Sequence, residues 1–171
     1  MIPETAENRT VELHRAENFP SSWKLVKTLL RDVLLVDTTP FQHEGVWYFF
    51  TATVEEVSGN WLETWLFYSD RLDGEWTYHP SNPICSDVRR ARPAGNLFYR
   101  QGKLIRPAQD CSIRYGYALV LNEVLKLSPT CYEERPLEVI YPNWMEGILG
   151  THTLNATEEF EVIDATRVPT A

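Results

Sequence analysis

One pattern constrains the fold of this 171-residue chain more than any other: a strand, a glycine turn and a second strand occur twice, 57 positions apart. Each copy has an aromatic residue, a glycine four positions later and an apolar strand after it: Phe41, Gly45 and residues 47–52 in the first copy, Phe98, Gly102 and residues 104–105 in the second. Glycine supplies the positive φ that a tight hairpin turn needs. Sheets of four strands repeated at about this period are typical of β-propellers, in which each blade packs against the next.

Short strands bounded by turn residues fill the first copy. We expect strands at residues 33–37, 47–52, 63–69 and 76–79, turns at 43–45 and 73–74, and a polar loop at 58–60. The run 47–52 is apolar on both faces, which predicts a strand in the centre of its sheet. Before this unit, residues 23–29 alternate between apolar and polar side chains. The alternation favours a strand over the competing short amphipathic helix at 22–31.

The second copy extends the pattern towards the C-terminus. We expect a hairpin at 97–105, a third strand at 115–121, a fourth near 138–140, and a further unit that begins at 150–155 and continues through 160–164. The sequence therefore predicts an all-β protein, built from propeller blades of four antiparallel strands and without a long helix. We place it in one domain, residues 1–171, with blade divisions at about 14–32, 33–87, 88–147 and 148–171.

Basic residues gather in one stretch of an otherwise acidic chain. The formal net charge is −8, yet residues 88–114 hold seven basic groups and one acid. Nucleic-acid binding needs a broad basic face, so this distribution argues against a nucleic-acid partner. A localised cluster suits a small anionic or polar ligand. The alternative is a solvated basic hairpin, which the sequence leaves open.

Two Arg-Pro pairs, Arg92-Pro93 and Arg106-Pro107, bracket the second hairpin. A residue before proline favours extended backbone, so we expect both arginines at strand ends or on edge strands. Asp110 closes this stretch, and pairing with Arg92 or Arg106 would orient its carboxylate. A structural ion pair is the alternative role for Asp110. The predicted binding wall for a saccharide or sugar phosphate comprises Arg89, Arg90, Arg92 and Arg106.

Other features narrow the class of protein. No apolar run approaches the ~20 residues of a membrane-spanning helix. Residues 1–10 are polar and acidic, unlike a signal peptide. The three cysteines lack C-x-x-C spacing, and no two histidines stand at metal-ligand spacing. We therefore expect a cytoplasmic protein without a metal or other cofactor.

Four stretches carry a family resemblance: VDTTPFQHEGVWYFF, LFYSDRLDGEWTYHPSNPI, RRARPAGNLFYRQGKLIRPAQDCSIRYGYAL and GTHTLN. They resemble the later blades of five-bladed propellers of the arabinanase, xylosidase and invertase glycoside hydrolase class. The chain is most similar to the propeller that precedes the glycosyltransferase domain in the glucosamine inositolphosphorylceramide transferase family. The resemblance runs from about His14 to Asp164 and implies an incomplete five-bladed propeller of roughly three blades. It also implies that a second copy or a partner chain covers the open blade faces, with a truncated product as the remaining alternative.

The resemblance suggests a role in carbohydrate chemistry. Glycosidases of this class use carboxylates on their inner strands, which implies Asp37, placed before T-T-P-F, and Asp110 as catalytic candidates. For Asp37 the alternative is turn formation, at which aspartate is effective. The class also places a base aspartate in its first blade, which has no counterpart in this sequence, and no general-acid glutamate is evident.

Two further residues are candidates for saccharide binding. His152, at a strand start in G-T-H-T-L-N, could reach the centre of the propeller, although a structural role is the alternative. Trp144, beside Pro142 and Asn143, is the best candidate for stacking on a sugar ring. The sequence therefore predicts a carbohydrate-recognition module of a sugar-modifying or glycosyltransferase system. The alternative is a glycosidase-like hydrolase, or part of one.

Overall fold

The computed structural model describes residues 1–54 and 61–167, and the polar loop expected at 58–60 lies outside the described residues. One 3₁₀ turn, η1 (Ala6–Asn8), precedes the strands. The strands of the first half are β1 (Thr10–Asn18), β2 (Ser22–Arg31), β3 (Leu35–His43), β4 (Val46–Val54), β5 (Trp61–Ser69) and β6 (Thr77–Tyr78). Those of the second half are β7 (Arg92–Pro93), β8 (Phe98–Arg100), β9 (Lys103–Asp110), β10 (Ala118–Ser128), β11 (Cys131–Ile140), β12 (Ile148–Gly150), β13 (Leu154–Ala156), β14 (Glu161–Ile163) and β15 (Thr166–Arg167).

The first copy of the repeat is a four-stranded antiparallel sheet in the order β3-β4-β5-β6. The hairpin between β3 and β4 turns at Glu44 and Gly45, whose φ angles of 49° and 82° are both positive, as a two-residue turn of type I′ requires. The aromatic strand β4 is central and its residues 48–52 are buried, as predicted. The expected strands at 63–69 and 76–79 correspond to β5 and β6.

The second copy forms a sheet in the order β11-β10-β9-β7, with β8 also paired to β9. The hairpin between β8 and β9 turns at Gln101 and Gly102, with φ angles of 53° and 76°. The same two-residue turn therefore occurs at both glycines of the sequence repeat. The glycine turns predicted at these two positions are confirmed.

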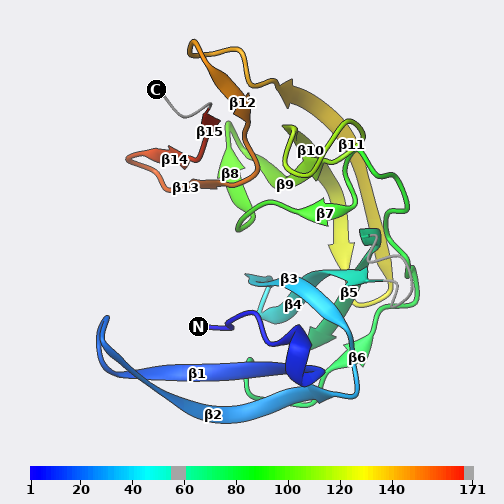
Figure 1. The fold of residues 1–171 in the computed structure, drawn as a ribbon. Helices are drawn as coiled ribbons and strands as arrows, with labels where there is room; N and C mark the ends of the chain where they lie inside the picture. The colour runs from blue at the N-terminus through cyan, green and yellow to red at the C-terminus, as the bar shows by residue number, and fades with distance from the viewer. Residues whose placement is uncertain (55–60, 168–171) are drawn as a thin grey trace.

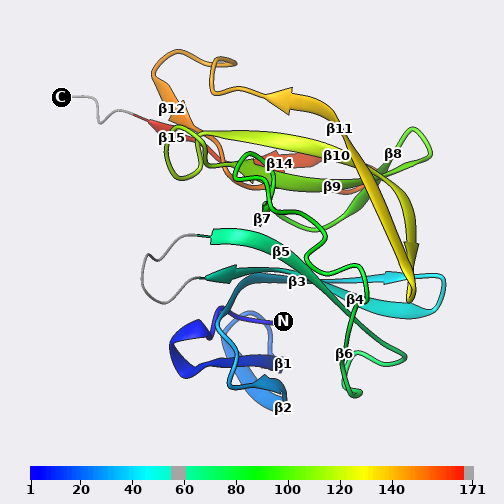
Figure 2. The same cartoon turned by 90° about the vertical axis from the view of Figure 1, so that its right-hand side faces the viewer.

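Smaller sheets lie at the two ends of the chain. β1 pairs with β2, so the strand prediction for residues 23–29 is confirmed against the helical alternative. β12 pairs with β15, and β13 pairs with β14. Seen from the side, the β3–β6 sheet lies between the β1–β2 hairpin and the β7–β11 sheet (Figure 2). The consecutive sheets follow an arc that does not close (Figure 1).

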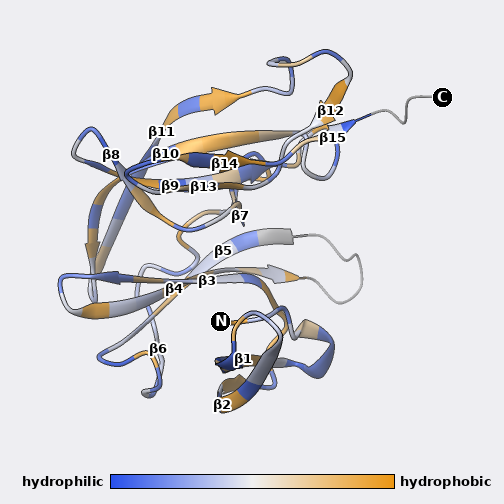
Figure 3. Cartoon of the chain, turned by 90° about the vertical axis from the view of Figure 1, so that its left-hand side faces the viewer, coloured by the Kyte–Doolittle hydropathy of each residue, from blue (hydrophilic) through white to orange (hydrophobic). Residues whose placement is uncertain are grey.

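Three apolar layers hold the sheets together: one between the β1–β2 hairpin and the β3–β6 sheet, one between the β3–β6 and β7–β11 sheets, and one between the β7–β11 sheet and the β13–β14 pair. Successive residues of a strand point to opposite faces, so β4 serves two layers. Phe49 faces the β1–β2 hairpin, whereas Phe50 faces the β7–β11 sheet. The third layer joins β9 and β10 to β13 through Ile105, Leu119 and Leu154, and apolar colour runs along much of β10 (Figure 3). Face-to-face packing of consecutive sheets is the arrangement of propeller blades, so the chain has an all-β propeller fold.

In three successive repeats the first strand is interrupted at the same place. The pairing of β3 with β4 shifts register around residues 37–38. Residues 94–97 separate β7 from β8, and residues 151–153 separate β12 from β13. A residue within a break leaves the strand ladder and can turn towards a central space. The breaks contain Thr38, Gly95 and His152, each 57 positions after the previous one.

Two details of the second copy differ from expectation. The third strand begins at Ala118 rather than at residue 115, because Tyr115 and Gly116 form a turn in which Gly116 has a φ of 62°. Arg106 lies in the middle of β9, paired across to Asn122 of β10, and its side chain is buried. The expectation of a strand end or edge is therefore correct for Arg92, on the edge strand β7, and wrong for Arg106. No helix in the described part of the chain is long and apolar enough to cross a membrane.

Candidate functional site

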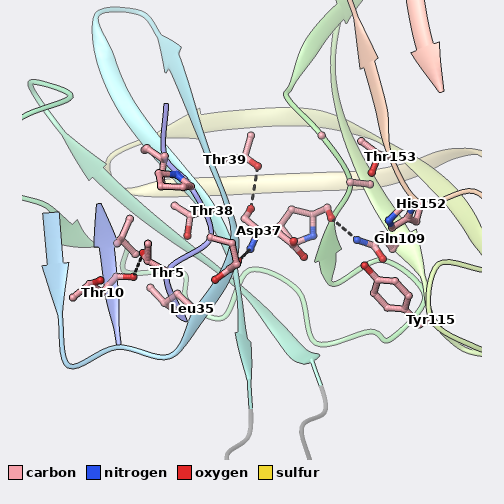
Figure 4. Close-up of a pocket in the computed structure, with 17 residues that line it drawn as sticks. Thr5, Thr10, Leu35, Asp37, Thr38, Thr39, Gln109, Tyr115, His152 and Thr153 are labelled. Carbon is pink, nitrogen blue, oxygen red and sulfur yellow. Dashed lines mark hydrogen bonds between the residues drawn. The ribbon is translucent and has the colours of Figure 1, made fainter. Parts of the chain in front are cut away.

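The three strand breaks line one cavity of about 300 Å³, together with the N-terminal segment (Figure 4). Each break contributes through the departure of its backbone from the strand ladder rather than through a helix or a long loop. The lining includes Glu4, Asp37, Thr38, Gly95, Tyr115 and His152. The sequence repeat thus brings together polar groups that are more than a hundred positions apart.

Asp37 holds the first break in place. Its backbone has a φ of 55°, a left-handed conformation that aspartate tolerates better than most residues. Its backbone N–H donates to Glu4 Oε2 at 3.0 Å, and its carboxylate Oδ2 lies 2.6 Å from Arg92 Nε. Burial raises the pKa of the Asp37 carboxyl above its ordinary value of 3.8, and the charge of Arg92 offsets only part of that rise.

Arg92 lies outside the cavity and contacts two of the residues that line it. It is 8% exposed and lies beside the lining residues rather than among them. Its guanidinium carbon lies 4.7 Å from the centre of the Tyr115 ring, a cation–π distance. The Tyr115 ring in turn meets the His152 ring edge to face, with centroids 5.5 Å apart. Arg92 therefore orients a carboxylate and an aromatic ring that both border the cavity.

Asp164 fixes His152, and sequence reasoning did not identify this aspartate. Asp164 lies between β14 and β15, opposite the break at 151–153. Its Oδ1 accepts hydrogen bonds from the backbone N–H groups of His152 and Thr153 at 2.8 and 2.9 Å, and its Oδ2 contacts His152 Nδ1. A ring Nδ1–H held by a carboxylate leaves Nε2 as the acceptor of the neutral imidazole. The only available signal was the position of Asp164 at a strand end.

We expect Asp164→Asn to change the tautomer of His152. The asparagine keeps one oxygen for the two backbone donors but replaces Oδ2 with an N–H₂ group, which cannot accept from Nδ1. ¹⁵N spectra of the imidazole should show the proton on Nδ1 in the parent protein and on Nε2 in the variant. His79, whose Nε2 lies 2.8 Å from the Ser128 carbonyl, is the internal control and should not change. An unchanged His152 spectrum would contradict the assigned role of Asp164.

Arg106 belongs to the core rather than to this cavity. Its Nε and Nη2 donate to the two carboxylate oxygens of Glu134, both at 2.7 Å, and Nη2 also donates to the Arg90 carbonyl at 3.0 Å. Tyr132 donates to the same carboxylate at 2.6 Å. Arg106 therefore pairs with Glu134 and not with Asp110, which corrects the expected pairing.

The other predicted residues are distributed over different surfaces. Arg89, Arg90 and Asp110 line a second cavity, and Asp110 Oδ1 accepts from the hydroxyl and the backbone N–H of Ser112. Trp144 lies half-exposed between β11 and β12. The structure therefore brings Asp37, Arg92 and His152 together and separates them from the remaining candidates. Within residues 1–54 and 61–167, no group of three or more His, Cys, Asp or Glu side chains could hold a metal ion.

Comparison with known proteins agrees with the fold. A family model described as glucosamine inositolphosphorylceramide transferase 1, N-terminal, matches residues 1–161. The chain is 37% identical over 143 residues to glucosamine inositolphosphorylceramide transferase 1 of Oryza sativa subsp. japonica, covering 81% of this chain and 19% of that protein. Identity to the Arabidopsis thaliana protein of the same name is 38% over 140 residues, covering 78% of this chain and 18% of that protein.

One solved structure shares the fold at low sequence identity. Bacteroides ovatus xyloglucan PUL GH43B superposes with a TM-score of 0.55 and 13% identity, over 92% of this chain and 31% of that chain. The present chain spans about a fifth of the length of the curated plant relatives. The chain has a propeller fold, and it belongs to the family of the N-terminal region of glucosamine inositolphosphorylceramide transferase 1.

Proposed function

We propose that this propeller module binds a polar saccharide in the cavity where the three strand breaks meet, as part of a glycosyltransferase system. The convergence of Asp37, Tyr115 and His152 on that cavity carries the proposal. A carboxylate accepts hydrogen bonds from sugar hydroxyls, and a neutral imidazole accepts another. An aromatic ring offers its face to the C–H side of a pyranose. The carboxylate, the imidazole and the aromatic ring are together complementary to a ligand that has both hydroxyl groups and an apolar ring face.

The charge balance favours a neutral saccharide over an anionic one. Arg92 is already paired with Asp37, and Glu4 adds a second carboxylate to the lining. A phosphate or uronate would have to compete with Asp37 for the guanidinium and lie close to Glu4. Like charges at such distances disfavour binding. An anionic saccharide is therefore the alternative ligand, and a sugar phosphate should bind more weakly than the matched neutral sugar.

Hydrolysis is the second candidate function, and the raised pKa of Asp37 favours it. A raised pKa moves a carboxyl towards the range in which general acids work. Inverting hydrolysis also needs a carboxylate base, with a separation of about 6.5–9.5 Å. Asp110 does not line this cavity, and Asp164 is engaged by His152. Glu4 does line it, but its two oxygens accept from the backbone N–H groups of Ala6 and Asp37. Release of phenol from a panel of aryl glycosides, lost in Asp37→Asn, would establish the hydrolase instead of the binding module.

Calorimetric titration tests the binding proposal. The ligands are glucosamine and an inositol phosphate, which are chosen from the name of the plant relatives, and neutral gluco-oligosaccharides. We expect Asp37→Asn to weaken the tightest ligand by about 1.5–3 kcal/mol, the scale of a hydrogen bond to a charged group. Tyr115→Ala should also weaken it, and the exposed Tyr99, outside this cavity, provides the matched control Tyr99→Ala. Binding unchanged in both cavity variants, with melting curves that show folded protein, would refute the site.

We further propose that a second copy of the chain covers the β1–β2 hairpin. This sheet has two strands, whereas the β3–β6 blade has four. Leu25 and Val26 are each 47% exposed, and Val26 borders a cavity of about 420 Å³ together with Leu13 and Trp23. Unpaired strand edges and apolar surface of this kind are usually covered in a stable protein.

Sedimentation equilibrium tests this association. We expect a mass near twice 19.8 kDa at micromolar concentration, and a shift of Val26→Glu towards the monomer because a charge at that position opposes burial. Lys24→Glu, on the same strand but pairing with Glu17 at 3.9 Å, is a control for a change of charge alone. A monomer mass for the parent protein at that concentration would contradict self-association and would favour a different partner chain.

A further inference from the structure

A second cavity, of about 410 Å³, lies between the turn at residues 87–91 and the outer strands β10 and β11. It is separate from the central cavity because of strand geometry. Gln109 lines the central cavity and the next residue, Asp110, lines the second one. Neighbouring residues of a strand point to opposite faces of the sheet, so β9 divides the two spaces.

One wall of this cavity is polar and rigidly held. Arg89 donates from Nε and Nη2 to the two oxygens of Asp87, at 3.0 and 2.9 Å. The backbone N–H groups of Arg90 and Ala91 both donate to the Asp87 carbonyl at 2.8 Å. Arg90 Nε lies 3.6 Å from Asp87 Oδ2, and Arg90 Nη1 lies 3.5 Å from Glu134 Oε1. A wall fixed in this way loses little conformational freedom when a ligand binds.

The opposite side is apolar and ends in an aromatic ring. Val120, Pro136 and Val139 line it, and Tyr141 stands beside them with half of its surface exposed. The Tyr141 ring also lies 6.3 Å from the Tyr117 ring, which helps to hold its orientation. A tyrosine face next to small apolar side chains is a suitable surface for the C–H face of a pyranose.

The charges in this cavity balance. Two arginines, Arg89 and Arg90, face two aspartates, Asp87 and Asp110. The bond from Arg89 lowers the pKa of Asp87, so that this carboxyl stays ionised at neutral pH. In the described part of the chain, the hydrogen-bond partner of Asp110 is Ser112, which uses Oδ1. The second oxygen of Asp110 is therefore an acceptor for a sugar hydroxyl, and two of the five N–H donors of Arg89 are engaged by Asp87.

We propose that this second cavity is a separate subsite for a neutral pyranose. The ring stacks on Tyr141, one hydroxyl donates to Asp110, and Arg89 donates to a ring or hydroxyl oxygen. The balanced charge selects a neutral sugar over a phosphorylated one. The subsite depends on its own residues and holds whether or not the central cavity binds a ligand.

An NMR titration with methyl glucoside, methyl galactoside and a hexose phosphate tests this subsite. We expect the neutral glycosides to shift the Tyr141 ring signals and the Asp110 amide. These shifts should occur whether or not the signals of Thr38, Gly95 and His152, in the central cavity, also change. Tyr141→Ala should weaken the neutral glycosides about tenfold or more, the scale of a lost aromatic contact and its buried area. Tyr99→Ala is the matched control, because Tyr99 is also exposed and lines neither cavity.

Asp110→Asn is a second test of the subsite, for use if Tyr141→Ala does not fold. Among the described residues, its carboxylate accepts hydrogen bonds from the nearby Ser112 alone, so the variant should fold and should bind the glycosides more weakly than the parent. Three results would overturn the subsite: no shift at Tyr141 up to several tens of millimolar glycoside, equal affinity in the parent and both variants, or tighter binding of the hexose phosphate than of the neutral glycosides.

Discussion

Replacing Arg106 by methionine should lower the free energy of unfolding by about 3–5 kcal/mol, the cost of leaving one partner of a buried ion pair alone. The side chains of Arg106 and Glu134 are 1% and 4% exposed, and two hydrogen bonds join them. Methionine fits the volume of the arginine stem, but it removes the cation that makes both close hydrogen bonds to Glu134 and leaves Arg90 Nη1, at 3.5 Å, as the remaining partner of that carboxylate. Urea denaturation followed by tryptophan fluorescence measures the change.

A second substitution separates charge from packing. Arg106→Met with Glu134→Gln removes both charges and keeps an oxygen that accepts from Tyr132. We expect this double variant to recover most of the lost stability, because apolar or neutral replacements of both partners cost far less than breaking the pair. A single variant as stable as the parent would contradict the buried pair, and a double variant no better than the single one would assign the loss to packing.

The same pair sets an acid limit to stability. Burial raises the pKa of Glu134, but the charge and hydrogen bonds of Arg106 lower it by more. The pKa in the folded protein therefore lies below the ordinary value of 4.5. The stabilisation from Glu134 is therefore complete above about pH 4.5 and declines as the pH falls through the folded pKa. Denaturation at descending pH should show a steeper loss for the parent than for the double variant. Parallel curves would rule out this contribution.

Gly95→Ala should cost about 2–4 kcal/mol of stability, because the site combines a forbidden backbone angle with a steric clash. Gly95 has a φ of 126°, and a Cβ there would overlap the Leu154 carbonyl oxygen. The neighbouring hydrogen bond from the Leu154 N–H to the Ala94 carbonyl, at 2.8 Å, would have to break or shift. Thermal melts of the purified variant measure the loss.

Gly45→Ala is the matched control for this prediction. Gly45 also has a positive φ, 82°, but a Cβ there would meet nothing within 4 Å. Its expected cost is about 1–2 kcal/mol, from the backbone angle alone. Equal losses in the two variants would show that the approach of Leu154 to Gly95 does not constrain the fold.

The strands and turns could be predicted because they depend on local sequence. The positive φ angles at Gly45 and Gly102 follow from the turn that two adjacent strands need. The burial of residues 48–52 follows from a run that is apolar on both faces. The fold class follows from these elements and their repetition, without knowledge of any side-chain contact.

The partners of the charged residues could not be predicted in the same way. Arg106 meets Glu134 because β10 lies between β9 and β11 and sets their relative position, over a separation of 28 residues. A proline after Arg106 indicated extended backbone, but it could not show that the strand has neighbours on both sides. Asp164 reaches His152 because the residues between β14 and β15 lie opposite the break at 151–153. Such contacts depend on register, which the hydrophobic pattern alone does not specify.

We propose that three blades contribute equivalent positions to one saccharide site. Amide chemical shifts at Thr38, Gly95 and His152 test it directly, because these residues lie in the strand breaks of three successive blades and line the same cavity. Titration with the tightest saccharide from the calorimetric panel should shift all three amides with a single dissociation constant. Shifts at only one of them, or at none while the ligand binds elsewhere, would contradict a saccharide site shared by the three blades.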